Sequence, residues 1–278
     1  MSWSIVLDSS CDLFLNHKFE NAELKIAPLT IRVGEKEFID DDDIDVSSLL
    51  TAMDEEKKAS STACPSPDIF YENFKTSDNV ICICITDRLS GTYNAAVVAQ
   101  NMIKEEYPEK NIYVVNSRST AGEMVLIAKK ADFLIGQGLP FEQICKELDE
   151  YAKETRLIFT IENFDNLIKA GRMKPLVGKV VSTLGIHLIA QASKEGTVEV
   201  MFKVRGEDKT LEKMVDYMNS QKDMTGKPVF ISHCDNFKAV DKLREILKEK
   251  CHTDDITITH CKGLTSFYAM NKGVLIGY

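Results

Sequence analysis

Along the first 155 residues, a pattern of apolar run, short polar loop and amphipathic segment repeats three times. The apolar runs cover residues 4–7, 80–85 and 112–115, and each of them ends at polar side chains. Continuous apolar runs are typical of strands that are covered on both faces of a parallel sheet. The repeats therefore predict an N-terminal parallel sheet with helices on both sides.

The second repeat has the clearest boundaries. Its strand is followed by the loop Arg88–Thr92 and by a helix that we predict over residues 93–107. The side chains at core spacing in this helix are Ala95, Val98, Ala99, Met102 and Ile103. Ligands of open α/β sheets bind beyond the C-terminal ends of the strands, where a helix N-terminus offers free N–H groups to an anion. Residues 90–92 are therefore the first candidate for an anion-binding site.

The other two repeats carry signals for the start of a helix. Asp8 follows the first strand, and its side chain is expected to cap a helical turn. Thr120 and Glu123 have the spacing of a capping box after the third strand. This spacing predicts a helix that starts there and stops at Gly136 or Gly138.

Three segments between the first two repeats stand apart. Residues 24–40 resemble a hairpin excursion with a turn at Gly34. The acidic run 40–43 lacks the ligand spacing of a calcium loop, so we expect a solvated acidic turn. Residues 60–67 predict a stiff loop rich in hydroxyl groups, because Pro65 and Pro67 hold the preceding chain extended. A plain helix-capping loop remains the alternative for this last segment.

The pattern changes after residue 154, where strands and helices no longer alternate simply. Strands are predicted at residues 157–161, 186–192, 198–204, 229–233, 256–260 and 273–278, and helices at 164–170, 176–184, 211–218 and 239–247. The predicted fold class is α/β with two domains. Residues 1–155 form an N-terminal parallel-sheet α/β domain, and residues 156–278 form a C-terminal α+β domain with a mixed sheet.

Composition restricts the range of functions. The formal net charge of −9 argues against nucleic acid as the main partner, because binding to phosphate backbones needs a clustered basic face. No apolar run is long enough to span a membrane, so contact with a membrane is expected to be transient at most. The N-terminus lacks the pattern of a secretory signal, which predicts a cytoplasmic protein.

The eight cysteines fit that location, because they lack the spacing of zinc ligands. Cys82 and Cys84 lie close together and face the same way along a strand, where we expect buried free thiols. No metal site is predicted.

Four stretches together give the chain a resemblance to the DegV family of fatty-acid-binding proteins. They are Asp8-Ser9-Ser10, Thr62-Ala63-Cys64-Pro65-Ser66, Leu89-Ser90-Gly91-Thr92-Tyr93 and Leu167-Ile168-Lys169-Ala170-Gly171-Arg172. Each stretch is a weak signal alone, but their order and spacing together are specific. The resemblance covers essentially the whole chain.

The resemblance implies one long-chain fatty acid in a tunnel between the two domains. Its carboxylate would be held by Thr62, by Ser90 with Gly91, and by His260 after Thr259. A buried carboxylate needs several hydrogen bonds to offset its desolvation, and a cationic histidine adds opposite charge. The chain departs from the family pattern at residues 261–263, where Lys262 is a competing partner for the carboxylate.

The resemblance also implies a partner. The bound acid would be presented to a separate ATP-dependent fatty acid kinase, which makes the acyl phosphate, so this chain would be neither an enzyme nor the carrier of a cofactor. Arg172 and Arg205 are then candidates for docking the kinase or neutralising the phosphate, since a planar guanidinium suits phosphate geometry.

A serine hydrolase or esterase is the alternative. Ser90 would be its nucleophile, His260 its base, and Asp87 or Asp235 would orient the histidine. No G-x-S-x-G elbow surrounds Ser90, which disfavours this reaction class. Nucleotide binding is disfavoured as well, because the Walker and dinucleotide glycine patterns are absent.

Overall fold

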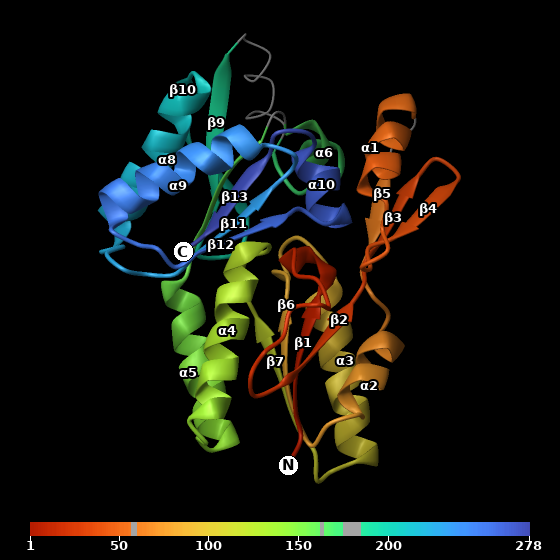
Figure 1. Ribbon diagram of the computed structural model, residues 1–278. Coiled ribbons are helices and arrows are strands. Elements are labelled where there is room, and N and C mark those ends of the chain that lie inside the picture. The colour runs from red at the N-terminus through yellow and green to blue at the C-terminus, as the bar shows by residue number, and fades with distance from the viewer. Residues whose placement is uncertain (57–59, 162–163, 175–184) are drawn as a thin grey trace.

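The computed structural model describes residues 1–56, 60–161, 164–174 and 185–278. Their strands form three sheets, which Figure 1 shows as a lower parallel sheet, an upper mixed sheet and a small sheet to one side. The helix predicted at residues 176–184 lies outside the described residues.

The first sheet is parallel throughout and has the strand order β2-β1-β6-β7. Its strands are β2 (Glu23–Ala27), β1 (Trp3–Asp8), β6 (Asn79–Cys84) and β7 (Asn111–Asn116). The covering helices are α2 (Pro67–Phe74) and α3 (Thr92–Glu106) on one face, and α4 (Gly122–Gly136) and α5 (Phe141–Glu154) on the other (Figure 1). The predicted parallel sheet with helices on both sides is confirmed.

The second sheet has six strands in the order β10-β9-β8-β13-β11-β12, of which only β11 and β12 pair in parallel. Its strands are β8 (Leu157–Ile161), β9 (Ile186–Ala192), β10 (Val198–Arg205), β11 (Val229–His233), β12 (Ile256–His260) and β13 (Val274–Gly277). One face packs on the helices α8 (Glu207–Gln221) and α9 (Phe237–Cys251), and the other lies by the shorter helices α6 (Asp165–Lys169) and α10 (Gly263–Ala269). The predicted C-terminal mixed sheet is confirmed, while α10 was not predicted.

The third sheet is small and antiparallel, and helix α1 (Val46–Glu55) accompanies it (Figure 1). Its strands are β3 (Thr30–Val33), β4 (Lys36–Ile39) and β5 (Ser61–Ala63). The excursion from the parallel sheet therefore begins at β3, and the segment near residue 24 is instead the parallel edge strand β2. Alternating side chains occur in both kinds of sheet, so the pattern alone did not decide which sheet each strand joins.

Helix α3 buries three of its five predicted core residues and exposes the other two. Val98 and Met102 are 48% and 37% exposed, whereas Ala95, Ala99 and Ile103 are buried. Ala96 is buried as well, so alanines dominate the buried face. When a helix carries apolar residues on more than one side, tertiary packing decides which side is buried. In α3 the small side chains face the sheet.

The predicted capping box at Thr120 and Glu123 is wrong. The residue before α4 is Ala121, which has a φ of 52° and makes no side-chain cap. The Thr120 hydroxyl instead donates to the Ser10 carbonyl at 3.1 Å, and Glu123 Oε1 accepts from the Thr155 hydroxyl at 2.9 Å. Both side chains form hydrogen bonds to segments that are distant in sequence, and local spacing does not reveal such bonds. The expected cap at Asp8 is confirmed, because Asp8 accepts from the Ser10 N–H at 3.0 Å.

The expected solvated turn at residues 40–43 is also wrong at its first residue. Asp40 is fully buried, and its carboxylate accepts hydrogen bonds from the backbone of α10. A charge run is usually solvated, but here hydrogen bonds from these N–H groups partly offset the desolvation of the carboxylate.

The free thiols are as expected. Cys82 and Cys84 are buried, with their sulfur atoms 3.6 Å apart. Within the described part of the chain, no group of three or more histidine, cysteine, aspartate or glutamate side chains is placed to hold a metal ion. No helix among the described residues is long and apolar enough to cross a membrane.

Glu123 makes the stability of the protein depend on pH. Burial raises the pKa of Glu123 to about 7, and the hydrogen bond from Thr155 only partly opposes this. The folded state therefore binds the proton more tightly than the unfolded state, so the contribution of this proton to stability is lost as pH rises through about 7. We expect the stability advantage of wild type over Glu123→Gln to shrink by about 2 kcal/mol between pH 5 and pH 8.

Urea unfolding of both proteins at a series of pH values measures this difference. Glutamine keeps the acceptor for Thr155, so the comparison isolates the proton. A pH-independent difference would show that Glu123 does not titrate in this range.

Candidate functional site

The C-terminal ends of the parallel strands face the mixed sheet across a cavity of about 830 Å³, including its open mouth. Loops after β6 and β7 form one wall, and β8, β9, β10 and β13 form another. The residues that line it are Leu29, Thr62, Ile85, Thr86, Leu89, Ser90, Ser119, Thr120, Leu157, Phe159, Ile161, Leu167, Arg172, Ala192, Gly196, Thr197, Val198, Leu264, Thr265, Tyr268, Ala269 and Leu275.

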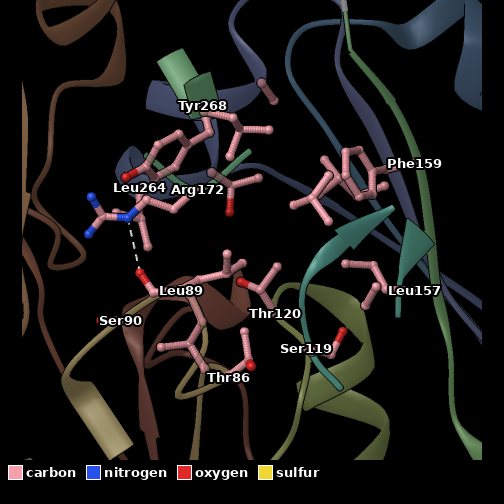
Figure 2. A pocket seen from close by; sticks show the side chains of 18 of the residues that line it. Thr86, Leu89, Ser90, Ser119, Thr120, Leu157, Phe159, Arg172, Leu264 and Tyr268 are labelled. Atoms are coloured by element: carbon pink, nitrogen blue, oxygen red, sulfur yellow. Dashed lines mark hydrogen bonds between the residues drawn. The ribbon is translucent and has the colours of Figure 1, made fainter. Parts of the chain in front are cut away.

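The cavity lining is mostly apolar, and Ser90, Arg172 and Tyr268 form a polar end. Figure 2 shows Leu157 and Phe159 on one side, and Ser90, Arg172 and Tyr268 on the other. Arg172 is the one charged side chain among the described residues that line the cavity, and no carboxylate lines it there. Such a site suits a ligand with a long apolar part and an anionic end.

The guanidinium of Arg172 is fixed by backbone carbonyls. Its Nε donates to the Leu89 carbonyl at 3.1 Å, drawn as a dashed line in Figure 2, and Nη1 donates to the Ala170 carbonyl at 2.6 Å. Gly171, with a φ of 74°, makes the left-handed turn that ends α6 just before Arg172. The predicted helix end thus places this arginine at the cavity.

The structure brings three of the four predicted carboxylate-binding residues together. Thr62 lies on β5 and Ser90 lies on the loop before α3, and both line the cavity. A Cβ added to Gly91 would lie 3.3 Å from the sulfur of Cys64, so the two loops are in contact. The Ser90 hydroxyl lies 2.8 Å from the Thr92 hydroxyl, which orients it locally.

The structure places His260 elsewhere. It is not among the residues that line the cavity, and its side chain is 55% exposed in a separate groove beside α1. Its ring lies 4.5 Å from that of His233 and 5.4 Å from that of Phe237, and its Nδ1 lies 3.7 Å from Asp235 Oδ1. The sequence order did not reveal that the end of β12 turns away from the cavity.

Lys262 and Arg205 also lie away from the cavity lining. Lys262 Nζ is 2.8 Å from Asp42 Oδ1 and stands over the ring of Phe14, so its charge already has a partner. Arg205 is exposed at the end of β10, roughly 20 Å along the strand from Val198, which lines the cavity.

The turn between β9 and β10 closes the cavity against the N-terminal half. Gly196 is at this turn with a φ of 85°, and an added Cβ would lie 2.1 Å from Thr86 Oγ1 and 3.1 Å from the Arg118 carbonyl. Only glycine allows the turn to approach so closely.

Six polar residues that line the cavity were not predicted as site residues: Thr86, Ser119, Thr120, Thr197, Thr265 and Tyr268. Thr86 and Thr120 follow the strands β6 and β7. Their hydroxyl groups just after a strand end could have marked them in the sequence as ligand-binding candidates. Thr265 and Tyr268 lie on the unpredicted helix α10. The Tyr268 hydroxyl is 3.2 Å from the Thr62 hydroxyl, so it joins the polar end of the cavity.

The geometry does not support a serine hydrolase. All five histidines lie in the described ranges, and none of them lines the cavity beside Ser90. A serine nucleophile needs a base within hydrogen-bond reach. Ser90 bonds instead to Thr92.

The fold and the cavity define a class: an α/β protein with a parallel and a mixed sheet that enclose a largely apolar ligand site. A family model described as an uncharacterised protein of the DegV family matches residues 2–274. The chain belongs to the DegV family. The resemblance noted in the sequence is thus confirmed.

Relatives and solved structures agree with this membership. A DegV domain-containing protein of Streptococcus pyogenes serotype M18 is 39% identical over all of this chain and 99% of its own length. The Streptococcus pneumoniae Fatty Acid Kinase (Fak) B3 protein loaded with linoleic acid has a TM-score of 0.95 and 36% identity, covering 100% of this chain and 99% of its own. A DegV family protein from Eubacterium eligens loaded with heptadecanoic acid has a TM-score of 0.94 and 32% identity, covering 99% of both chains.

Proposed function

We propose that this protein binds one long-chain fatty acid in the cavity between its sheets. The observation that carries the proposal is the cavity itself, which is apolar except for hydroxyl groups and one arginine. The fatty acids bound by the two similar structures support the same ligand class. Burial of the acyl chain supplies the affinity, and the polar end selects a carboxylate.

In this proposal, the hydroxyl groups of Thr62 and Ser90 donate to the carboxylate, together with the backbone N–H of Gly91. The position of Thr62 and Ser90 on one cavity wall supports this assignment. Arg172 supplies the positive charge, and its bonds to the carbonyls of Leu89 and Ala170 hold it at that end. His260 lies outside the cavity, and its side chain is exposed. In this proposal it contacts a partner rather than the acyl chain.

We further propose that the chain is a non-catalytic binding protein that presents its fatty acid to a separate ATP-dependent kinase. The similarity to the Fatty Acid Kinase (Fak) B3 protein supports this role. Arg172, at the cavity, would then neutralise the acyl phosphate, and Arg205, exposed at the end of β10, would dock the kinase.

Mass spectrometry of an organic extract from the purified protein tests the proposed ligand. We expect a long-chain fatty acid in near-stoichiometric amount, because so apolar a cavity retains an acyl chain through purification. The loaded protein should then yield acyl phosphate only with both ATP and a fatty acid kinase. A clean extract from a protein that also takes up no added fatty acid would exclude the proposal.

A further inference from the structure

Helix α10 forms part of the cavity wall, and carboxylates from the N-terminal half hold its first residues. The Lys262 N–H donates to Asp12 Oδ1 at 2.8 Å. The N–H groups of Gly263 and Leu264 donate to the two oxygens of Asp40, at 2.7 and 3.1 Å. Such N–H groups have no partner within a helix, so these side chains complete the start of α10 from a distant part of the chain.

Asp40 is packed tightly against this helix. An added Cβ on Gly263 would lie 2.8 Å from Asp40 Oδ1 and 2.3 Å from Ile44 Cδ1, so a side chain at this position would displace Asp40 or Ile44. Burial raises the pKa of Asp40, and the Ser9 hydroxyl, the α10 backbone and Lys262 oppose this. The carboxylate therefore has dedicated partners rather than solvent.

The opposite side of α10 faces the cavity. Leu264, Thr265, Tyr268 and Ala269 line the cavity. Figure 2 shows Tyr268 beside Arg172 at the polar end. The Tyr268 hydroxyl is 3.2 Å from the hydroxyl of Thr62 on β5, and β5 belongs to the same small sheet as β4, which ends just before Asp40. The small sheet, with Asp40 after β4, thus contacts α10 twice: at the start of the helix and again at the polar end of the cavity.

We propose that Asp40 is a positioning residue for the ligand's carboxylate. By holding the N–H groups of Gly263 and Leu264, it fixes α10 so that the Tyr268 hydroxyl stays opposite Thr62. Tyr268 is then a third hydroxyl group for the carboxylate. This inference rests on the proposed binding of a fatty acid.

Asp40→Asn is the central test, because asparagine keeps the shape but replaces one acceptor with an N–H₂ group that cannot accept from α10. We expect its affinity for a long-chain fatty acid to fall about tenfold. Affinity for the matching methyl ester, which shares the tail but has no charge, should change less than about twofold. Asp43→Asn, an exposed residue of the same acidic run, is the control and should bind both ligands like wild type.

A double-mutant cycle with Tyr268→Phe separates positioning from general damage. If Asp40 acts through Tyr268, adding Asp40→Asn to Tyr268→Phe should cost little further affinity for the acid. Additive effects, or an equal loss for the acid and the ester, would overturn the inference.

If Asp40→Asn does not fold, Asp42→Asn is the substitute test. The side chain of Asp42 is 30% exposed, and it forms an ion pair with Lys262, the residue just before the helix. It should show a smaller loss, also specific to the acid, and unchanged acid binding would equally overturn the inference. A wild-type protein that binds neither ligand would instead contradict the proposed function.

Discussion

Replacing Thr62 with valine or Ser90 with alanine is expected to weaken binding of a long-chain fatty acid by about 1–3 kcal/mol each. Each hydroxyl group lines the polar end of the cavity and would donate to a charged carboxylate that water no longer solvates. Valine keeps the shape of threonine, so the loss reports the hydrogen bond. Titration calorimetry with protein freed of its bound ligand measures the change.

Ser66→Ala is the matched control for these variants. Ser66 lies between α2 and the strand β5 that carries Thr62. It is exposed, makes no side-chain cap for α2 and is not among the cavity-lining residues. Its removal should leave affinity unchanged. Wild-type affinity in the Thr62→Val/Ser90→Ala double variant would place the carboxylate at another part of the cavity.

The second large effect is on folding. Gly277→Ala is expected to lower stability by about 3 kcal/mol, because an added Cβ would lie 2.4 Å from both the Glu123 nitrogen and the Gly122 carbonyl carbon. These are backbone atoms at the start of α4, so neither can move aside like a flexible side chain. The contact joins β13 of the mixed sheet to a helix of the parallel sheet.

Thermal unfolding should show a midpoint about 6–12 °C lower for Gly277→Ala. Gly226→Ala is the control, because Gly226 has a φ of 64° and open space around its Cα. Gly226→Ala should lose only about 1 kcal/mol of stability, because alanine is strained in the left-handed backbone conformation. Equal midpoints for both variants would show that the two halves separate easily at this contact.

The sequence predicted most strands and helices because their boundaries are local. The apolar run of β6, the glycines after α4 and the turn between β9 and β10 all depend on neighbouring residues. Errors arose where a side chain serves a distant segment. Glu123 pairs with Thr155 rather than with its own helix start, and Asp40 is buried against α10 rather than solvated.

The residues at the polar end of the cavity also include some that the sequence predicted and one that it did not. The resemblance to the family predicted Thr62 and Ser90 as site residues, because each belongs to one of its short motifs, and both residues line the cavity. Tyr268 was not predicted, since α10 is too short to give a clear helical period and its start is stabilised by carboxylates far away in the chain.

By itself, the sequence determined the parallel and mixed sheets and, through four short motifs, the resemblance to the family. The two sheets follow from hydrophobic periodicity and turn chemistry, which act over a few residues. Only the tertiary structure decided that Arg172 lines the cavity, that His260 lies outside it and that α10 brings Tyr268 to Thr62. The physical reason is that strand ends and short helices take their directions from packing between the sheets, and that packing joins residues more than 200 positions apart, as Thr62 and Tyr268 are.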